Sequence, residues 1–220
     1  KIALIGCGSR GTGAAFQALS TKFNLKIVAM ADAFPDKLEK SYQTLLTKFG
    51  AEKISVPGDK KFVGFDGYIA AMQDADVVML CTPPGFRPAH FAEAVKQNKQ
   101  IFMEKPVATD SPGIRSVLAT AEEAKRKKLN VVVGLQRHYQ KNYREIIDRV
   151  HQGGIGDVIS GQVYWNSGGV WVNPRQPNQT EMEYQMRNWY YFNWLCGDHI
   201  VEQHVHNIDV ANWVKNKYPV

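Results

Sequence analysis

The chain has 220 residues, 44% of them hydrophobic and 22% charged, which is the composition of a folded globular protein rather than a disordered or fibrous one. Its formal net charge of +6 does not indicate nucleic acid, because the densest basic run, KRKK at residues 125–128, closes a predicted helix where cations complement the helix dipole. No apolar run is long enough to span a bilayer, so neither nucleic acid nor a membrane is an expected partner.

The sequence begins inside what reads as a buried strand, KIALIG, so any leader segment would lie outside it. We take the cytoplasm as the default location and leave export open. The three cysteines, Cys7, Cys81 and Cys196, are far apart and form no CxxC pair. This spacing is typical of reduced, buried cysteines rather than of a disulfide framework or a zinc site.

Residues 1–135 alternate apolar strands with amphipathic helices. Strands are predicted at residues 2–6, 26–31, 76–82, 100–104 and 130–135, with a further short one at 62–63. These runs are apolar almost throughout, as expected of strands buried on both faces. Helices are predicted to begin at Pro35 and to cover residues 87–98 and 111–128. Repeated βα units predict a parallel sheet with helices on both faces.

The pattern changes after Leu135. A predicted helix at residues 141–152 leads into a glycine-rich turn, and an alternating strand is predicted at residues 157–166. A polar loop and an aromatic cluster at residues 188–194 follow. We therefore divide the chain into a first domain, residues 1–137, and the start of a second, residues 138–220. Because a single strand is too few for a stable sheet, we expect the intact protein to continue past Val220.

A glycine-rich loop, GCGSRG at residues 6–11, has the pattern G-x-G-x-x-G. It follows a predicted buried strand and opens a helix rich in small residues, which is the context of a dinucleotide-binding loop. The glycines permit a tight turn and close approach to a pyrophosphate, and the helix N-terminus favours its negative charge. An ordinary tight turn is the alternative. The expected cofactor contacts here are Gly6, Gly8, Ser9, Arg10 and Gly11.

Asp32 stands at the end of the second predicted strand, 21 residues after Gly11. A carboxylate in this place binds the ribose hydroxyls of an adenosine and repels a 2′-phosphate. Ala33 and Phe34 provide no cation for such a phosphate, although Lys37 is close in sequence. We therefore predict NAD as the cofactor, with NADP less favoured. A helix-capping aspartate is the alternative.

Two further turns follow predicted strands. One strand ends in Thr82-Pro83-Pro84, and the next ends in Glu104-Lys105-Pro106. The carboxyl ends of parallel strands form the rim where doubly wound sheets bind ligands. A lysine held there, Lys105, could face the nicotinamide and exchange a proton with the substrate.

These residues resemble the Gfo/Idh/MocA oxidoreductases, named for glucose–fructose oxidoreductase and inositol dehydrogenase. The resemblance covers the whole sequence, including His90 after the prolyl turn, Arg137 in GLQR, and GGIGD at residues 153–157. The EKP triplet is fairly specific, whereas the glycine loop alone is not. The family implies that Thr82, Pro83, Pro84, His90, Glu104 and Lys105 line the cofactor site.

The resemblance also implies the architecture. It predicts a Rossmann domain with a doubly wound parallel sheet, followed by an α/β domain with an open, mainly antiparallel sheet that is incomplete in this chain. The far face of that second sheet often makes oligomer contacts in the family. We therefore expect a homo-oligomer, either a dimer or a tetramer.

The stretch EQHVHNID, residues 202–209, corresponds to the D-x-G-x-H-x-x-D pattern of the family. His206 takes the place of the catalytic histidine, Glu202 replaces the usual aspartate, and His204 replaces the usual glycine. Glu202 and His206 are four residues apart and would share one helical face. The longer acidic side chain puts its role in question, and His204 indicates a modified pocket.

Two other interpretations of this stretch stay open. His199, Glu202, His204 and His206 are plausible metal ligands, since E-x-x-x-H can bind zinc. His204 and His206 would however face different sides of a helix, and the family supplies a metal-free role, so we predict no metal. A purely structural helix with buried histidines is the other alternative.

Arg137, Trp165 and Tyr191 are the substrate candidates besides His206, with Trp189 and Tyr190 adjacent to Tyr191. Aromatic faces stack on sugar rings, although such residues more often belong to a core or an interface.

The leading functional hypothesis is an NAD-dependent dehydrogenase that transfers hydride between a carbohydrate or polyol hydroxyl carbon and nicotinamide. Lys105 and His206 would be its acid–base pair, with Glu202 orienting or assisting the histidine. One alternative is an NAD-dependent glycosidase acting by transient oxidation and elimination. The other is a dinucleotide-responsive regulator without catalysis, because fold does not fix function.

Overall fold

The computed structural model describes residues 1–218, and the chain forms two compact units, Lys1–Val133 and Gly134–Val220. The domain limits predicted for the protein, with a boundary after residue 137, stay a prediction.

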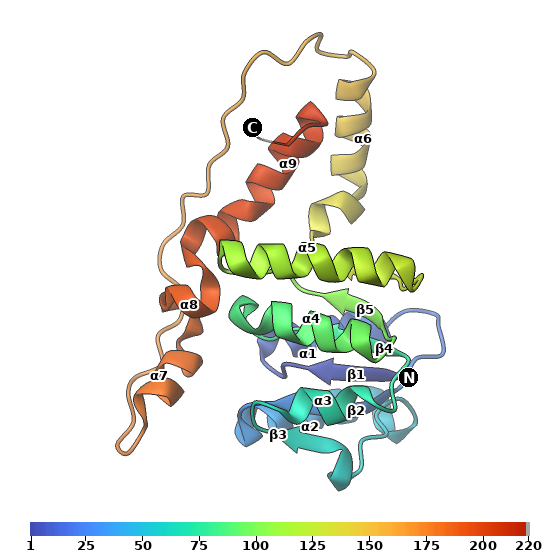
Figure 1. Cartoon of the computed structure of the whole chain (residues 1–220), viewed down its shortest axis with the longest axis vertical. Coiled ribbons are helices and arrows are strands. Elements are labelled where there is room, and N and C mark those ends of the chain that lie inside the picture. Colours follow the sequence, from blue (N-terminus) through green and yellow to red (C-terminus); the bar gives the residue numbers. More distant parts are fainter. Residues whose placement is uncertain (219–220) are drawn as a thin grey trace. The chain divides into compact units, whose positions relative to one another are not determined.

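The first unit is built on a parallel six-stranded sheet with the order β3-β2-β1-β4-β5-β6 (Figure 1). This order places the switch point between β1 and β4 and defines a doubly wound Rossmann sheet, which confirms the predicted fold of this part. All six predicted strands are present, with ends that differ by at most two residues. They are β1 (Ile2–Ile5), β2 (Ile27–Asp32), β3 (Lys61–Val63), β4 (Val77–Leu80), β5 (Gln100–Met103) and β6 (Val131–Val133).

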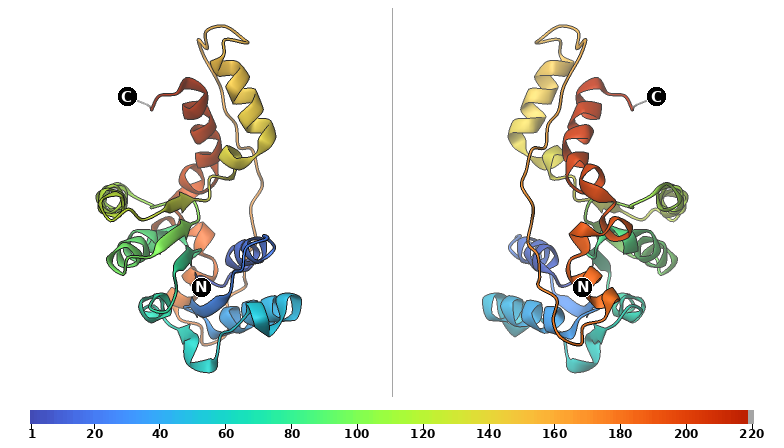
Figure 2. Two further views of the ribbon diagram at one scale, coloured as in Figure 1. Left: turned by 90° about the vertical axis from the view of Figure 1, so that its right-hand side faces the viewer. Right: turned by 90° about the vertical axis from the view of Figure 1, so that its left-hand side faces the viewer.

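Helices cover both faces of this sheet, as Figure 2 shows in side view. On one face lie α1 (Ser9–Leu19) and α2 (Pro35–Lys53); on the other lie α3 (Gly67–Met72), α4 (Arg87–Lys96) and α5 (Ser111–Arg126). Helix α2 begins at Pro35 as predicted. Proline suits a first helical position, because the N–H that it lacks would have no partner within the helix there. Helix α3 was not predicted, because six residues are too few to show a period.

Two apolar cores follow from the alternation along each strand. In β1, Ile2 and Leu4 face the core shared with α1 and α2, whereas Ala3 and Ile5 face the core shared with α3, α4 and α5. Successive side chains of a strand point to opposite faces, so a short uninterrupted apolar run supplies both cores. The rigid sheet that results holds the turns at the carboxyl ends of its strands.

The second unit is helical in the described residues. It contains α6 (Lys141–His151), α7 (Glu181–Arg187), α8 (Asn193–Cys196) and α9 (Val205–Lys215), with a π-helical turn, Ile200–His204, directly before α9. No helix among residues 1–218 is long and apolar enough to cross a membrane.

The predicted strand at residues 157–166 is wrong. The segment has no regular secondary structure, and it belongs to the long connection between α6 and α7 in Figure 1. Ile159 is 88% exposed, so the alternating apolar residues of this segment are not gathered into a core. A strand needs a neighbour to satisfy its backbone hydrogen bonds, and the described residues of this unit contain no strand to pair with it. The open antiparallel sheet predicted for the second domain is therefore not seen in the described part of the chain.

Candidate cofactor and catalytic site

The glycine loop between β1 and α1 is closely packed at two of its glycines and open at the third. Gly6 has a φ of +94°, and a Cβ there would lie 2.6 Å from the carbonyl carbon of Cys81; a Cβ at Gly11 would lie 1.9 Å from the carbonyl oxygen of Gly6. A Cβ at Gly8 would meet no atom within 4 Å. Gly6 and Gly11 therefore shape the turn, whereas Gly8 leaves room for a ligand to approach the backbone closely, as a dinucleotide requires.

Helix α1 presents its N-terminus at this opening. Gly8 is the N-cap residue without a capping side chain, and the first closing bond runs from the amide of Thr12 to the carbonyl of Gly8 at 2.9 Å. The amides of Ser9, Arg10 and Gly11 precede that bond, so they have no acceptor within the helix. Donors of this kind bind phosphate groups.

Asp32 ends β2 as predicted, and its carboxylate is tied to the glycine loop. Its Oδ2 accepts a hydrogen bond from the amide of Cys7 at 2.7 Å, and its Oδ1 accepts one from the amide of Phe34 at 2.9 Å. Burial raises the pKa of Asp32, and these two bonds act in the opposite direction by favouring the carboxylate. Each carboxylate oxygen keeps further acceptor capacity, so Asp32 can also bind ribose hydroxyls. The opening at Gly8, the helix amides and this acid together fit a dinucleotide.

Thr82 follows β4 and is held in place by two buried side chains. Its hydroxyl lies 3.1 Å from Nδ1 of His90, and its carbonyl accepts a hydrogen bond of 2.6 Å from Arg87, which also donates to the carbonyl of Leu80. The ring of His90 packs against Tyr68 with 4.1 Å between centroids. Burial, with a smaller effect from Arg87, lowers the pKa of His90 to about 3. His90 is therefore neutral near pH 7 and supports Thr82, while its predicted contact with the cofactor stays a prediction.

Arg87 is a structural residue that the sequence reasoning missed. Only 1% of it is exposed, and an arginine is rarely so buried. The signal in the sequence was its place three residues after the prolyl turn, at the start of a predicted helix. Pro84 of the same turn is also buried.

Glu104 and Lys105 follow β5 at the same edge of the sheet. The amide of Glu104 donates to the carbonyl of Leu80 at 2.9 Å, which fixes the EKP turn beside β4. The carboxylate of Glu104 forms an ion pair with Arg10 at 3.1 Å. The glycine loop and the EKP turn are thus connected by an ion pair, and Lys105 is the next residue.

In the second unit, the catalytic candidates Glu202 and His206 are both buried, with 6% and 7% exposure. Glu202 belongs to the π-helical turn and His206 to the first turn of α9, so the two lie on one continuous helical stretch. His204, between them, is only partly buried. Isolated π-helical turns occur frequently at functional sites. Lys105 belongs to the first unit and His206 to the second.

Arg137 and Trp165 are brought together with His206 inside this unit. The guanidinium carbon of Arg137 is 6.0 Å from the centre of the Trp165 ring, and the rings of Trp165 and His206 are 6.1 Å apart and inclined by 28°. Asn207, which the sequence reasoning did not single out, accepts a hydrogen bond from Arg137.

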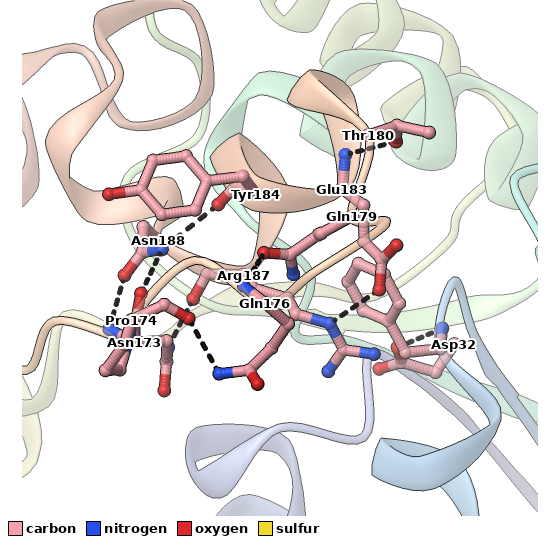
Figure 3. Close-up of polar contacts among 11 residues, drawn as sticks. Asp32, Asn173, Pro174, Gln176, Gln179, Thr180, Glu183, Tyr184, Arg187 and Asn188 are labelled. Atoms are coloured by element: carbon pink, nitrogen blue, oxygen red, sulfur yellow. Dashed lines mark hydrogen bonds and ion pairs between the residues drawn. The ribbon is translucent and has the colours of Figure 1, made fainter.

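Tyr191 is placed differently from these three residues. Its hydroxyl donates to the carbonyl of Val170 at 2.8 Å and accepts from the amide of the same residue at 3.1 Å. Asn188 holds the same loop, with bonds to Asn173 and Tyr184 that Figure 3 shows. Tyr191 therefore anchors a loop, and its contact with a substrate stays a prediction.

The histidines and acids of the second unit do not gather around a common point. Within residues 1–218, no group of three or more histidine, cysteine, aspartate or glutamate side chains is arranged to hold a metal ion. The three cysteines are free thiols.

The sheet order, the open glycine loop and the acid at the end of β2 define the first unit as a dinucleotide-binding Rossmann domain. Residues 1–134 match the family described as an oxidoreductase family with an NAD-binding Rossmann fold. The chain belongs to this family, the Gfo/Idh/MocA oxidoreductases, which confirms the resemblance found in the sequence.

Several curated relatives are named for the same activity. The inositol 2-dehydrogenase of Rhizobium meliloti (strain 1021) is 24% identical over 220 residues, which covers 100% of this chain and 56% of that protein. The inositol 2-dehydrogenase of Burkholderia cenocepacia (strain HI2424) is 28% identical over 156 residues, or 71% of this chain and 42% of that protein. The chain spans about half the length of the curated relatives it matches.

Solved structures show the same fold. The myo-inositol 2-dehydrogenase from Lactobacillus plantarum has a TM-score of 0.70 at 20% identity, covering 100% of this chain and 57% of that one. The scyllo-inositol dehydrogenase from Lactobacillus casei, with bound NAD(H) and scyllo-inositol, has a TM-score of 0.65 at 22% identity, covering 97% and 55%. At these identities the likeness concerns the fold alone.

Proposed function

We propose that this protein is an NAD-dependent dehydrogenase that oxidises a hydroxyl-bearing carbon of a cyclic polyol or carbohydrate. The observation that carries the proposal is the open approach at Gly8 between the α1 amides and Asp32, in a chain of an NAD-binding oxidoreductase family. The names of the relatives, inositol 2-dehydrogenases, support a polyol as the substrate class.

The first unit supplies the residues that would hold the cofactor. Ser9, Arg10 and Gly11 offer backbone amides to the pyrophosphate, and Asp32 accepts hydrogen bonds from the adenosine ribose. The negative charge of Asp32 disfavours a 2′-phosphate, which supports NAD over NADP. When bound, the nicotinamide accepts the hydride of the oxidised carbon. Thr82, Pro83, Pro84 and Glu104 would border the nicotinamide half, because they end the two strands beyond the switch point.

Lys105 and His206 would act together on the substrate hydroxyl. Lys105 removes the hydroxyl proton as the hydride leaves, and His206 donates a hydrogen bond to the same or an adjacent oxygen. Glu202, four residues before His206, orients the imidazole. The support is the position of Lys105 at the rim of the sheet and the burial of Glu202 and His206. Lys105 and His206 also match the family pattern, in which Glu202 stands in place of an aspartate.

Arg137 and Trp165 are the proposed substrate-binding residues next to His206. An indole face packs against the C–H face of a sugar or inositol ring, and a guanidinium donates to its hydroxyl oxygens. A homo-oligomer, dimer or tetramer, is proposed from the family resemblance alone.

The function is tested by purifying the protein, measuring NAD binding by calorimetry and screening inositol isomers, hexoses and glycosides. Absorbance of reduced nicotinamide and release of free sugar are followed in parallel. Accumulating NADH with a polyol supports the dehydrogenase. Sugar release without NADH indicates the redox-cycling glycosidase, and NAD binding with neither signal indicates a regulator; either result overturns the proposal.

The roles of Lys105 and His206 are tested by Lys105→Met and His206→Asn. Loss of general acid–base catalysis lowers kcat by roughly 10²- to 10⁴-fold, while the Kd for NAD stays within about threefold. Lys125→Met and His199→Asn are matched controls, because both native residues are exposed. If the Lys105 variant keeps full turnover, lysine is not the proton acceptor.

A further inference from the structure

Asn207 connects three segments of the second unit through one side chain. Its Oδ1 accepts a hydrogen bond from the guanidinium of Arg137, and its Nδ2 donates to the carbonyl of Tyr164 at 2.5 Å. Arg137 belongs to the 3₁₀ turn Gln136–Tyr139, Tyr164 to the long connection after α6, and Asn207 itself to α9. A side-chain amide accepts through its oxygen and donates through its nitrogen, on two separate atoms, so this residue type suits the bridge.

The two partners of Asn207 place the substrate candidates. Arg137 is held with its guanidinium on one side of the Trp165 ring, and the carbonyl that binds Asn207 belongs to the residue directly before Trp165. His206, the residue before Asn207, lies near-parallel to the same indole. One side-chain amide is thus bonded both to the cation and to the backbone directly before the aromatic ring, beside the proposed catalytic histidine.

The charge of Arg137 is not neutralised by an ion pair in the described part of the chain. Among residues 1–218, no carboxylate forms an ion pair with Arg137; its partners are the neutral amide of Asn207 and the rings of Trp165 and Tyr143. A partly buried guanidinium with only a neutral partner retains donor capacity. It fits a ligand that brings oxygen acceptors.

The turn that carries Arg137 has a second attachment to α9 that does not involve Asn207. His138, in the turn that carries Arg137, lies with its Nε2 2.7 Å from a carboxylate oxygen of Asp209 and stacks on Trp213 with 4.2 Å between ring centroids. The turn is therefore attached to α9 one residue after Arg137. For this turn, a purely structural role of the Asn207–Arg137 bond would duplicate that attachment.

We propose that Asn207 is a positioning residue for substrate recognition. It holds Arg137 and Trp165 as one recognition edge, cationic and aromatic, that binds a ring-shaped substrate rich in hydroxyl oxygens next to His206. The inference rests on the proposed function and adds to it a residue that neither the family pattern nor the sequence reasoning assigned.

The test compares two variants. Asn207→Leu removes both hydrogen bonds with a side chain of similar size. Asn207→Asp keeps the acceptor for Arg137 but loses the donor to Tyr164, and it places a carboxylate oxygen against the carbonyl oxygen of Tyr164. Steady-state kinetics use the best polyol of the screen. We expect Asn207→Leu to raise KM by about 10- to 100-fold, the range for a lost hydrogen bond to a charged group. Asn207→Asp should raise KM less, because its bond to Arg137 is kept, and kcat should change less than about threefold in both variants. Asn212→Leu, on the same helix and without a side-chain hydrogen bond in the described chain, is the control and should leave KM unchanged.

A double variant decides whether Asn207 acts through Arg137. If it does, Arg137→Met combined with Asn207→Leu raises KM no further than Arg137→Met alone. Additive effects, or a KM for Asn207→Leu equal to that of the wild type, overturn the inference. Failure of the proposed function looks different, because the wild type itself would then oxidise no polyol. For that case, quenching of tryptophan fluorescence by myo-inositol measures binding, and equal affinity of wild type and Asn207→Leu again overturns the inference.

Discussion

The hydroxyl of Thr82 lies 3.1 Å from Nδ1 of a histidine, His90, that is buried behind the rim of the sheet and neutral near pH 7. Because the imidazole is uncharged, one of its nitrogens accepts a hydrogen bond and the other donates one. Nδ1 faces Thr82 and orients its hydroxyl in either role. The prolyl turn after β4 is thereby fixed from within the first unit, at the edge where the cofactor is proposed to lie.

His90 makes the first unit sensitive to acid. Its pKa is about 3 in the folded protein and 6.5 as a free side chain, so below pH 6.5 the unfolded chain binds a proton that the native state does not. Stability is therefore lost as the pH falls from about 6.5 towards 3. At pH 5 this loss amounts to about 2 kcal/mol. The loss of stability is measured by urea unfolding at pH 7 and pH 5. Hydrogen exchange of peptides from β1, β4 and β5 then reports the stability of the first unit.

The comparison variant is His90→Asn, whose amide can still meet the hydroxyl of Thr82 but has no proton to gain in this range. It should be less stable at both pH values, because the packing against Tyr68 is lost, yet its stability should fall less between pH 7 and pH 5. An equal fall in wild type and variant would show that His90 is not the group responsible.

Two glycine substitutions separate folding from cofactor binding. Gly11→Ala places a methyl 1.9 Å from a backbone oxygen, so it should lower Tm by many degrees or prevent folding.

Gly8→Ala meets no atom within 4 Å and has an ordinary φ of −70°, so its Tm should match that of the wild type. Its methyl would occupy the space of the pyrophosphate, and the Kd for NAD should rise by about 10-fold or more. Calorimetry and thermal unfolding measure both; unchanged NAD binding by Gly8→Ala would falsify the proposed position of the pyrophosphate.

The first unit could be predicted from the sequence because its signals are local. Each strand is an apolar run buried on both faces, and each functional turn follows a strand directly, so the positions of Gly8, Asp32 and Lys105 follow from the order of the elements. The hydrogen bonds around Asp32 could not be foreseen, since their donors are the backbone amides of Cys7 and Phe34, which no side-chain pattern marks. Arg87 was missed because an arginine at a helix start usually lies on the surface.

The second unit was harder to predict because its contacts are distant in the sequence. The alternation at residues 157–166 predicts a strand, but strand formation depends on a partner that the pattern itself does not supply. The Asn207 bridge joins residues about 40 and 70 positions away, and no periodicity marks it. The family pattern located His206 but gave no role to the asparagine beside it.

Asp32 should control the choice of cofactor. Asp32→Ser replaces the charged carboxylate that accepts from the ribose hydroxyls with a shorter neutral hydroxyl, and it removes the charge that repels a 2′-phosphate. We expect the Kd for NAD to rise by about 10- to 100-fold, the range for a hydrogen bond to a charged group. The Kd for NADP should rise less or fall. Part of the effect will reach stability through the amides of Cys7 and Phe34, which is why the ratio of the two Kd values is the measurement. An unchanged ratio would show that Asp32 does not face the ribose.

Asn188 should determine how firmly the loop at residues 168–176 is held. It is 2% exposed; its Oδ1 accepts from the amide of Asn173 at 2.7 Å, and its Nδ2 donates to the carbonyls of Asn173 and Tyr184. Asn188→Leu leaves the backbone groups of Asn173 without these partners, at a cost of about 1–3 kcal/mol, so hydrogen exchange in the loop should accelerate by about 5- to 100-fold. Val172→Ala, in the same loop and with a native side chain that is exposed and apolar, is the control. If exchange accelerates equally throughout α7 and α9, Asn188 supports the whole unit and the loop is not a separately held segment.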